Sequence, residues 1–129
     1  NNIEQLSDKW VKQYCDLHNN DTYWTGERII SALDKFRVLL AVKDGQVLGY
    51  LDVQSCFDIN EIYALYIKPE ASSQGNELSL LTKAIELNKP NQMMVVVDAN
   101  NKEEVDLYTA VGFTKLEGQN SVTAYIKET

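Results

Sequence analysis

A turn before an apolar segment is the first place in the sequence where residue types suggest chemistry. The stretch PEASSQGNELSLL, residues 69–81, puts Gly75 directly before a segment with helical apolar spacing. Exposed backbone N–H groups at a helix N-terminus bind anions, and glycine lets an anionic group approach the backbone closely. Glu77, however, lies in the first turn, where its carboxylate would repel an anion. The stretch fits a weakened phosphate site, and also an ordinary helix start with Asn76 as N-cap.

Few other side chains are arranged for nucleophilic or metal chemistry. His18 is the single histidine, and the apolar spacing of its segment favours a packed or solvent-edge role over catalysis. Because there is no Cys/His cluster, we expect no metal site. Cys15 and Cys56 lie far apart in apolar segments, which favours free thiols in a reducing cytoplasm over a disulfide. The acidic residues within 103–106 are most simply a solvated helix face.

The composition is that of a single globular domain. A chain of 129 residues can build one core but not two, and 44% hydrophobic with 24% charged residues is ordinary. No apolar run is long enough to cross a membrane and no signal peptide opens the chain, so we expect a cytoplasmic protein without a membrane partner. A net charge of −7 argues against nucleic acid and weakly favours cationic ligands. The chain does not begin with methionine, which fits a domain excised from a longer protein.

The elements that would position these residues follow from periodicity, capping residues and turn signals. In chain order they are a helix capped by Ser7, a second helix capped by Thr25, strands at 36–42 and 47–57 joined by an Asp-Gly turn, a strand at 61–67, a helix after Gly75 closed at Asn88, a strand at 93–99, a helix from Asn101 to Gly112 and a closing hairpin.

These elements predict a mixed, mostly antiparallel α/β sheet with a central parallel pair flanked by helices. The parallel pair follows from the order strand, helix, strand across residues 61–98. The run MMVVVDA at 93–99 is continuously apolar, as a strand buried on both faces should be. In such sheets ligands bind beyond the carboxyl ends of the strands, which places residues 69–76 at the expected binding edge.

The order of elements and one segment resemble a known family. The strand EIYALYIKPE, the glycine turn and the pattern N-x-x-x-x-x-LY-x-x-x-GF over residues 101–113 resemble the GCN5-related N-acetyltransferases (GNAT). The likeness extends over roughly residues 25–115, and LYTAVGF is its most specific part. The family's opening β-strand is not evident before Ser7, which fits a trimmed domain. The resemblance implies a single GNAT-like domain over residues 1–129, with acetyl-CoA as cosubstrate and an amine as acceptor.

The resemblance also implies which residues bind the cosubstrate. In the family, a turn of pattern Q/R-x-x-G-x-G/A presents backbone amides to the CoA pyrophosphate. The middle glycine is kept here, whereas the first and last positions differ, because the six residues are Ser72, Ser73, Gln74, Gly75, Asn76 and Glu77. Main-chain groups of one strand segment would bind the thioester carbonyl and pantetheine, and the start of the last helix would lie near the pantetheine arm: Leu65, Tyr66, Ile67 and Asn101. As a plain N-cap, Asn101 would look the same.

Two residues take catalytic roles by this resemblance. Tyr108 falls on the tyrosine that protonates the departing CoA thiolate, and a phenol with a pKa near 10 keeps its proton until that thiolate forms. A core aromatic residue is the other interpretation of Tyr108. Glu61 is the candidate general base, because it opens its strand at the spacing before Ser72 that places the base in the histone-acetyltransferase branch. A solvated strand-end glutamate fits equally well, and Asp58 and Asp52 are substitutes.

The sequence thus predicts an N-acetyltransferase in which a bound amine attacks acetyl-CoA directly, without a covalent enzyme intermediate. The alternative is a non-catalytic domain of the same fold that binds a ligand or a partner protein, and the altered turn supports it. Tyr23 and Trp24 precede the second helix, where family members shape the acceptor pocket, and core packing explains them equally. The identity of the small-molecule or peptide amine and the oligomeric state, a homodimer included, stay open.

Overall fold

The computed structural model of the chain describes residues 2–18, 25–56, 59–72, 74–88, 92–98, 100–115 and 122–128. The strands are β1 (Asn2–Gln5), β2 (Phe36–Lys43), β3 (Gln46–Cys56), β4 (Ile59–Ile67), β5 (Gln92–Asp98), β6 (Thr114–Lys115) and β7 (Val122–Glu128). The helices are α1 (Val11–Leu17), α2 (Gly26–Ile30), α3 (Asn76–Asn88) and α4 (Lys102–Ala110), with short 3-10 turns η1 (Asp8–Trp10) and η2 (Pro69–Ala71). None of these helices is long and apolar enough to cross a membrane.

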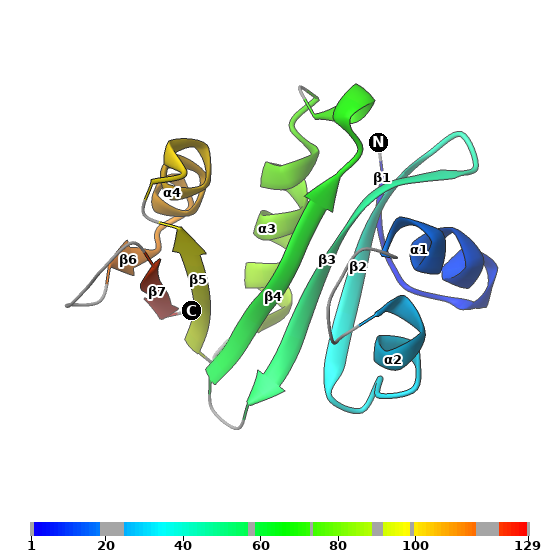
Figure 1. The fold of residues 1–129 in the computed structure, drawn as a ribbon, viewed down its shortest axis with the longest axis horizontal. Coiled ribbons are helices and arrows are strands. Elements are labelled where there is room, and N and C mark those ends of the chain that lie inside the picture. Colours follow the sequence, from blue (N-terminus) through cyan, green and yellow to red (C-terminus); the bar gives the residue numbers. More distant parts are fainter. Residues whose placement is uncertain are drawn as a thin grey trace.

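The described strands form one sheet in the order β1-β2-β3-β4-β5-β7-β6, with helices on both of its faces (Figure 1). The β4–β5 pair is parallel, and the other strand pairs are antiparallel. The chain passes from β4 to β5 through α3, which is the strand-helix-strand unit expected from the sequence. The predicted mixed, mostly antiparallel sheet with a central parallel pair is therefore confirmed.

Local sequence signals account for several element boundaries. Thr25 caps α2, because its Oγ1 accepts a hydrogen bond from the backbone N–H of Arg28 at 3.2 Å. In the turn between β2 and β3, Asp44 and Gly45 both have positive φ, as a two-residue Asp-Gly hairpin requires. Ser7 does not act as predicted: the chain enters α1 through η1, and the Ser7 side chain makes no capping hydrogen bond.

A strand does precede Ser7, contrary to the expectation from the sequence. β1 pairs antiparallel with β2 along its whole length, from Asn2 opposite Val42 to Gln5 opposite Leu39. Its residues, NIEQ, include one aliphatic side chain and show no alternation of buried and exposed positions. Pairing with the edge of β2 holds this strand in the sheet, and its own pattern carries too little signal to reveal it.

Two clusters of buried apolar side chains, one on each face of the sheet, join the strands to the helices that cover them. Leu81 of α3 and Tyr108 of α4 belong to the cluster on one face of the sheet. Tyr14 of α1 and Ile29 of α2 belong to the cluster on the other face. Alternate residues of β2 contribute to both clusters, so the apolar run of residues 36–42 is buried on both faces.

The prediction that MMVVVDA is buried on both faces is wrong. Met93, Val95 and Val97 are buried, whereas Val96 is 45% exposed. The reason is the placement of the helices: α1 and α2 lie beside β2 and β3, away from β5 (Figure 1). One face of β5 is therefore left open, and Val96 lies on it.

A buried polar cluster ties α1 to β3. Asp52 is fully buried, and its Oδ1 accepts a hydrogen bond from the Tyr14 hydroxyl at 2.7 Å. Its Oδ2 lies 2.5 Å from Nε2 of His18, which is 1% exposed and stacks on Tyr50 with ring centroids 4.5 Å apart. His18 is thus a packed residue, as expected, but Asp52 orients it, which the sequence did not indicate. Burial and the Asp52 carboxylate raise the pKa of the Tyr14 hydroxyl far above its usual value, so this donor stays protonated.

Replacement of Tyr14 by phenylalanine should lower the free energy of unfolding by about 1.5–3 kcal/mol, because the buried carboxylate loses a donor. Urea unfolding at neutral pH measures the change, and the denaturant slope should stay the same. Tyr66→Phe is the matched control: Tyr66 is 39% exposed, so its change should stay within about 0.5 kcal/mol. Equal losses in the two variants would show that the bond to Asp52 contributes nothing special.

Candidate active site

The parallel pair at the centre of the sheet is interrupted. Residues Ile59–Ile62 of β4 pair with residues Gln92–Val95 of β5, and the pairing ends there. Both strands continue beyond this point, and β4 stays paired with β3 as far as Ile67. Figure 1 shows the two strands close together at one end and apart at the other. On the β5 side, residues 64–67 of β4 therefore have no strand partner among the described residues.

A β-bulge lies where the two strands part. Val53 of β3 is opposite Ile62 of β4, whereas the preceding residue of β3, Asp52, is opposite Ala64. Tyr63 is therefore the extra residue on β4. A bulge redirects side chains and increases the local twist, which helps β4 to turn away from its parallel neighbour.

An open cavity of about 720 Å³ lies in the wedge between the two strands. Its walls include residues from both apolar clusters. Leu65, Val95 and Tyr108 come from the face that α3 and α4 cover. Tyr50 and Tyr63 come from the face that α1 and α2 cover. The cavity therefore reaches both faces of the sheet, which only an interruption of strand pairing allows.

The glycine turn borders this cavity at the carboxyl end of β4. Ser72, Gly75 and Glu77 are among the lining residues. Gly75 has a φ of +76°, and apart from its two chain neighbours no residue has an atom within 4 Å of the position that a Cβ would take, so a ligand can reach its backbone. Backbone N–H groups in the first turn of a helix point beyond its N-terminus, where they can bind an anion. Asn76 is buried, and its Nδ2 donates to the Ala71 carbonyl at 3.3 Å, which holds the turn in shape.

The LYTAVGF segment fixes Tyr108 against the cavity. Gly112 has a φ of +106°, which ends α4 and turns the chain back. The Phe113 N–H then donates to the Tyr108 carbonyl at 3.0 Å, and the two rings pack edge to face with centroids 5.5 Å apart. The residues that give the motif its pattern therefore hold the tyrosine in one orientation.

The surroundings of Tyr108 keep its hydroxyl protonated. Its side chain is 4% exposed and lines the cavity. Burial, and then the nearby Glu104 carboxylate, raise the pKa of the Tyr108 hydroxyl well above 10. Partial burial, and then Asp98, raise the pKa of Glu104 above its ordinary value. Tyr108 is therefore protonated at neutral pH, and it holds its proton more tightly than an ordinary phenol does.

The structure brings most of the predicted binding residues to the cavity. Those that line it are Leu65, Tyr66, Ile67, Ser72, Gly75, Glu77, Asn101 and Tyr108. Asn101 is also the N-cap of α4, because its Oδ1 accepts a hydrogen bond from the Glu104 N–H at 3.2 Å. Asn101 is therefore an N-cap that also lies on the cavity wall.

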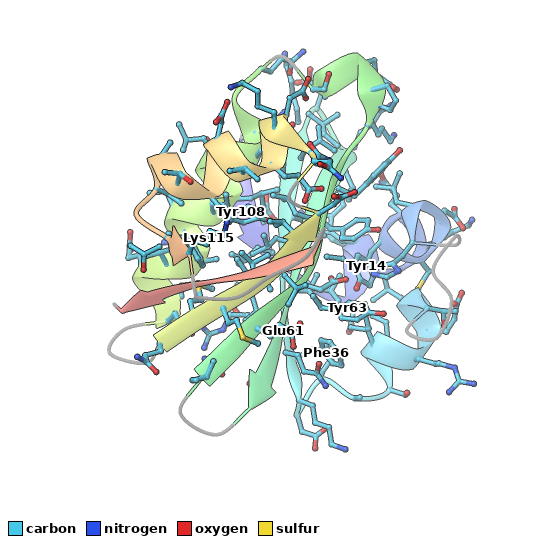
Figure 2. All side chains as sticks on the ribbon, turned by 60° about the vertical axis from the view of Figure 1, so that its left-hand side comes forward. Tyr14, Phe36, Glu61, Tyr63, Tyr108 and Lys115 are labelled. Atoms are coloured by element: carbon cyan, nitrogen blue, oxygen red, sulfur yellow. The ribbon has the colours of Figure 1, made fainter. Side chains whose placement is uncertain are left out.

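Other predicted residues lie elsewhere. Glu61, the candidate base, and Gln74 and Asn76 of the turn are not among the described residues that line the cavity. Figure 2 shows Glu61 on β4 well separated from Tyr108 on α4. Asp52 cannot replace Glu61, because it is fully buried and bonded to Tyr14 and His18. Four further residues with predicted roles lie outside the described part of the chain: Tyr23, Trp24, Asp58 and Ser73.

The sequence did not single out several lining residues. Besides Tyr50, Tyr63, Val95 and Val96 these include two acids of α4, Glu103 and Glu104, which were expected to be only a solvated face. With Glu77, three carboxylates border the cavity, and no lysine or arginine is among its described lining residues. A phosphate bound here would depend on backbone N–H groups. Within the part of the chain that the structure describes, no His, Cys, Asp and Glu side chains cluster in a way that could hold a metal ion.

Comparisons with known proteins agree with this geometry. Solved structures with the same fold include the PaiA N-acetyltransferase of Thermoplasma acidophilum in complex with coenzyme A, with a TM-score of 0.82, 17% identity, and coverage of 99% of this chain and 98% of that one. The ribosomal-protein-alanine N-acetyltransferase of Brucella melitensis has a TM-score of 0.80 and 21% identity, with all of both chains covered. A GNAT family acetyltransferase of Elizabethkingia anophelis with acetyl-CoA bound has a TM-score of 0.76 and 14% identity, covering 99% of this chain and 97% of that one.

Among curated proteins, none is similar enough in sequence to match. The sequence itself matches the family described as "Acetyltransferase (GNAT) domain" over residues 5–129. This match extends over nearly the whole chain, and the interrupted β4–β5 pair, the glycine turn and Tyr108 lie within it. The chain belongs to the family of GNAT acetyltransferase domains, whose members transfer an acetyl group from acetyl-CoA to an amine.

Proposed function

We propose that the donor thioester lies on the α3/α4 side of the cavity and that the acceptor amine reaches it from the α1/α2 side. The observation that supports this most strongly is the cavity itself, which joins the two faces of the sheet where β4 and β5 part. When the amine and the thioester enter from opposite faces of the sheet, the amine nitrogen can approach the carbonyl carbon while both substrates are bound. Direct attack, with no covalent enzyme intermediate, needs only this arrangement.

In the proposed mechanism, backbone groups bind the donor and side chains transfer protons. Backbone N–H groups around Gly75 bind the pyrophosphate, and unpaired backbone groups of Leu65, Tyr66 and Ile67 bind the pantetheine and the thioester carbonyl. The amine nitrogen attacks the carbonyl carbon, and the charge on the carbonyl oxygen is stabilised by a strand N–H. The carbon–sulfur bond then breaks, and Tyr108 gives its proton to the departing thiolate. Glu61 is the group proposed to take the amine proton. Because its side chain does not line the cavity, the proton passes to it through water.

The charge of the whole chain bears weakly on the acceptor. The carboxylates that border the cavity lie on α3 and α4, the donor side, so only the long-range field of a net charge of −7 favours a cationic amine over an anionic one. A small-molecule amine and a peptide amine both meet this condition. The rival function, a non-catalytic domain of the same fold, predicts that the donor is bound weakly or not at all.

The first test is binding of the donor. Because a ligand that binds only the folded state stabilises it by about 2.7 kcal/mol at a hundredfold excess over its Kd, saturating acetyl-CoA should raise the melting temperature by roughly 5–15 °C. Differential scanning fluorimetry with acetyl-CoA, and with pantetheine as the control that lacks the pyrophosphate, measures the shift. Pantetheine should produce a much smaller rise. No shift with millimolar acetyl-CoA would favour the non-catalytic alternative.

Tyr108→Phe tests the proton donor. The variant keeps the ring that packs on Phe113, so acetyl-CoA affinity measured by calorimetry should stay within about twofold of the parent. Turnover with an amine acceptor should fall by about 10²-fold or more, because the thiolate leaves without a proton. If affinity and turnover change little, Tyr108 is only a core residue.

Glu77→Gln tests the weakened phosphate site. Like charges about 4 Å apart repel by roughly 1 kcal/mol in water and more at lower dielectric, so CoA should bind about five- to tenfold more tightly at low salt. Glutamine keeps the helix propensity and nearly the shape of glutamate. The gain should shrink as ionic strength rises, because salt screens the repulsion.

Glu86→Gln is the matched control for this variant, because it makes the same change of net charge on an exposed residue at the other end of α3. It should leave CoA affinity almost unchanged. If both variants tighten binding equally, the effect comes from net charge alone and Glu77 does not face the phosphates.

A further inference from the structure

The inner end of the cavity is closed by two side chains. Ile62 and Val95 form the last residue pair between β4 and β5 before the strands part. Both side chains line the cavity, yet they are only 3% and 4% exposed. They belong to the same apolar cluster as Tyr108, and on their far side the strands are joined by continuous pairing. A ligand that enters the wedge therefore stops at Ile62 and Val95.

The orientation of the donor follows from the proposed function, on which this inference rests. The phosphate end lies at Gly75, at the carboxyl end of β4, and the sulfur lies beside Tyr108. Since the sulfur of an acyl-CoA lies between the phosphates and the acyl group, the acyl group must point away from Gly75. That direction leads to the closed end. We propose that Ile62 and Val95 set the acyl-chain length that the enzyme accepts, so that acetyl fits and longer acyl groups do not.

Packing makes this limit effective. Protein interiors are close-packed, so extra carbon atoms on the acyl group would overlap side chains that cannot move freely. Ile62 and Val95 pack in a cluster with residues of β2, β3, α3 and α4, which leaves them little room to yield. One methylene group more or less in such a pocket changes binding by roughly 10- to 200-fold.

Val95→Ala tests the proposal with acetyl-, propionyl- and butyryl-CoA as probes and calorimetric Kd as the readout. The substitution removes as many carbon atoms as butyryl adds to acetyl. In the parent protein butyryl-CoA should bind at least about tenfold more weakly than acetyl-CoA, and Val95→Ala should reduce this ratio by about tenfold. Propionyl-CoA should lie between the two.

Val97→Ala is the matched control. Val97 lies two residues further along β5 on the same face, is 3% exposed and belongs to the same cluster, but it does not line the cavity. It loses the same atoms from the same core, so the ratio of the Kd values should stay as in the parent. Should Val95→Ala fail to fold, Ile62→Val with propionyl-CoA makes the smaller change at the other wall and should narrow the propionyl-to-acetyl ratio.

Three outcomes would overturn the proposal: a parent protein that binds butyryl-CoA as tightly as acetyl-CoA, a Val95→Ala variant with an unchanged ratio, or a Val97→Ala variant with an equal change. The failure of the proposed function looks different. In that case the parent protein binds none of the acyl-CoA probes, and both proposals fall together.

Discussion

The β4–β5 pair stops at Ile62 and Val95 although both strands continue, and the geometry of the site depends on this interruption. Unpaired backbone groups inside a sheet are costly, so such a gap survives only where the strands are supported elsewhere. Here each strand keeps a full partner on its outer side. β4 is paired with β3 throughout its length, and β5 is paired with β7 from Gln92 to Asp98. The wedge can stay open because neither strand relies on the other to remain a strand.

The same interruption places two helix N-termini at one cavity. Each of the diverging strands is followed by a helix, so α3 and α4 begin near the open end of the wedge (Figure 1). Helix N-termini carry a partial positive charge that favours an anionic ligand. In this chain Glu77 on α3 and Glu103 and Glu104 on α4 oppose that field from the cavity wall. Affinity for the phosphates is therefore set by a balance between fixed backbone donors and fixed carboxylates, rather than by lysine or arginine side chains.

The sequence predicted those features of the fold that depend on neighbouring residues. The Asp-Gly turn, the Thr25 cap and the Tyr108–Phe113 segment each act through contacts within a few residues, and each appears in the structure. Features that depend on distant residues were missed. β1 is a strand because β2 offers an edge, and Val96 is exposed because α1 and α2 lie over other strands.

The polar contacts show the same limit. The bond between His18 and Asp52 joins residues 34 positions apart, so neither residue's surroundings in the sequence indicated it. Glu61 was chosen by spacing along the chain, but spacing does not determine which side of β4 a residue occupies. The cavity wall instead uses residues on either side of the bulge at Tyr63, whose position depends on the register with β3.

The buried cluster and the cavity meet at Tyr50. This ring stacks on His18, which is bonded to Asp52. It also lines the cavity on the α1/α2 face, and its centroid lies 5.7 Å from the centroid of the Tyr66 ring. In the proposed mechanism that face admits the acceptor. A buried charged or strongly polar pair contributes little net stability, because its attraction must first offset the loss of hydration, but it allows few alternative packings. An apolar pair in place of Asp52 and His18 would hold α1 equally well but would leave Tyr50 freer to move. Burial of the polar pair therefore fixes the wall of the cavity on the side where the acceptor enters.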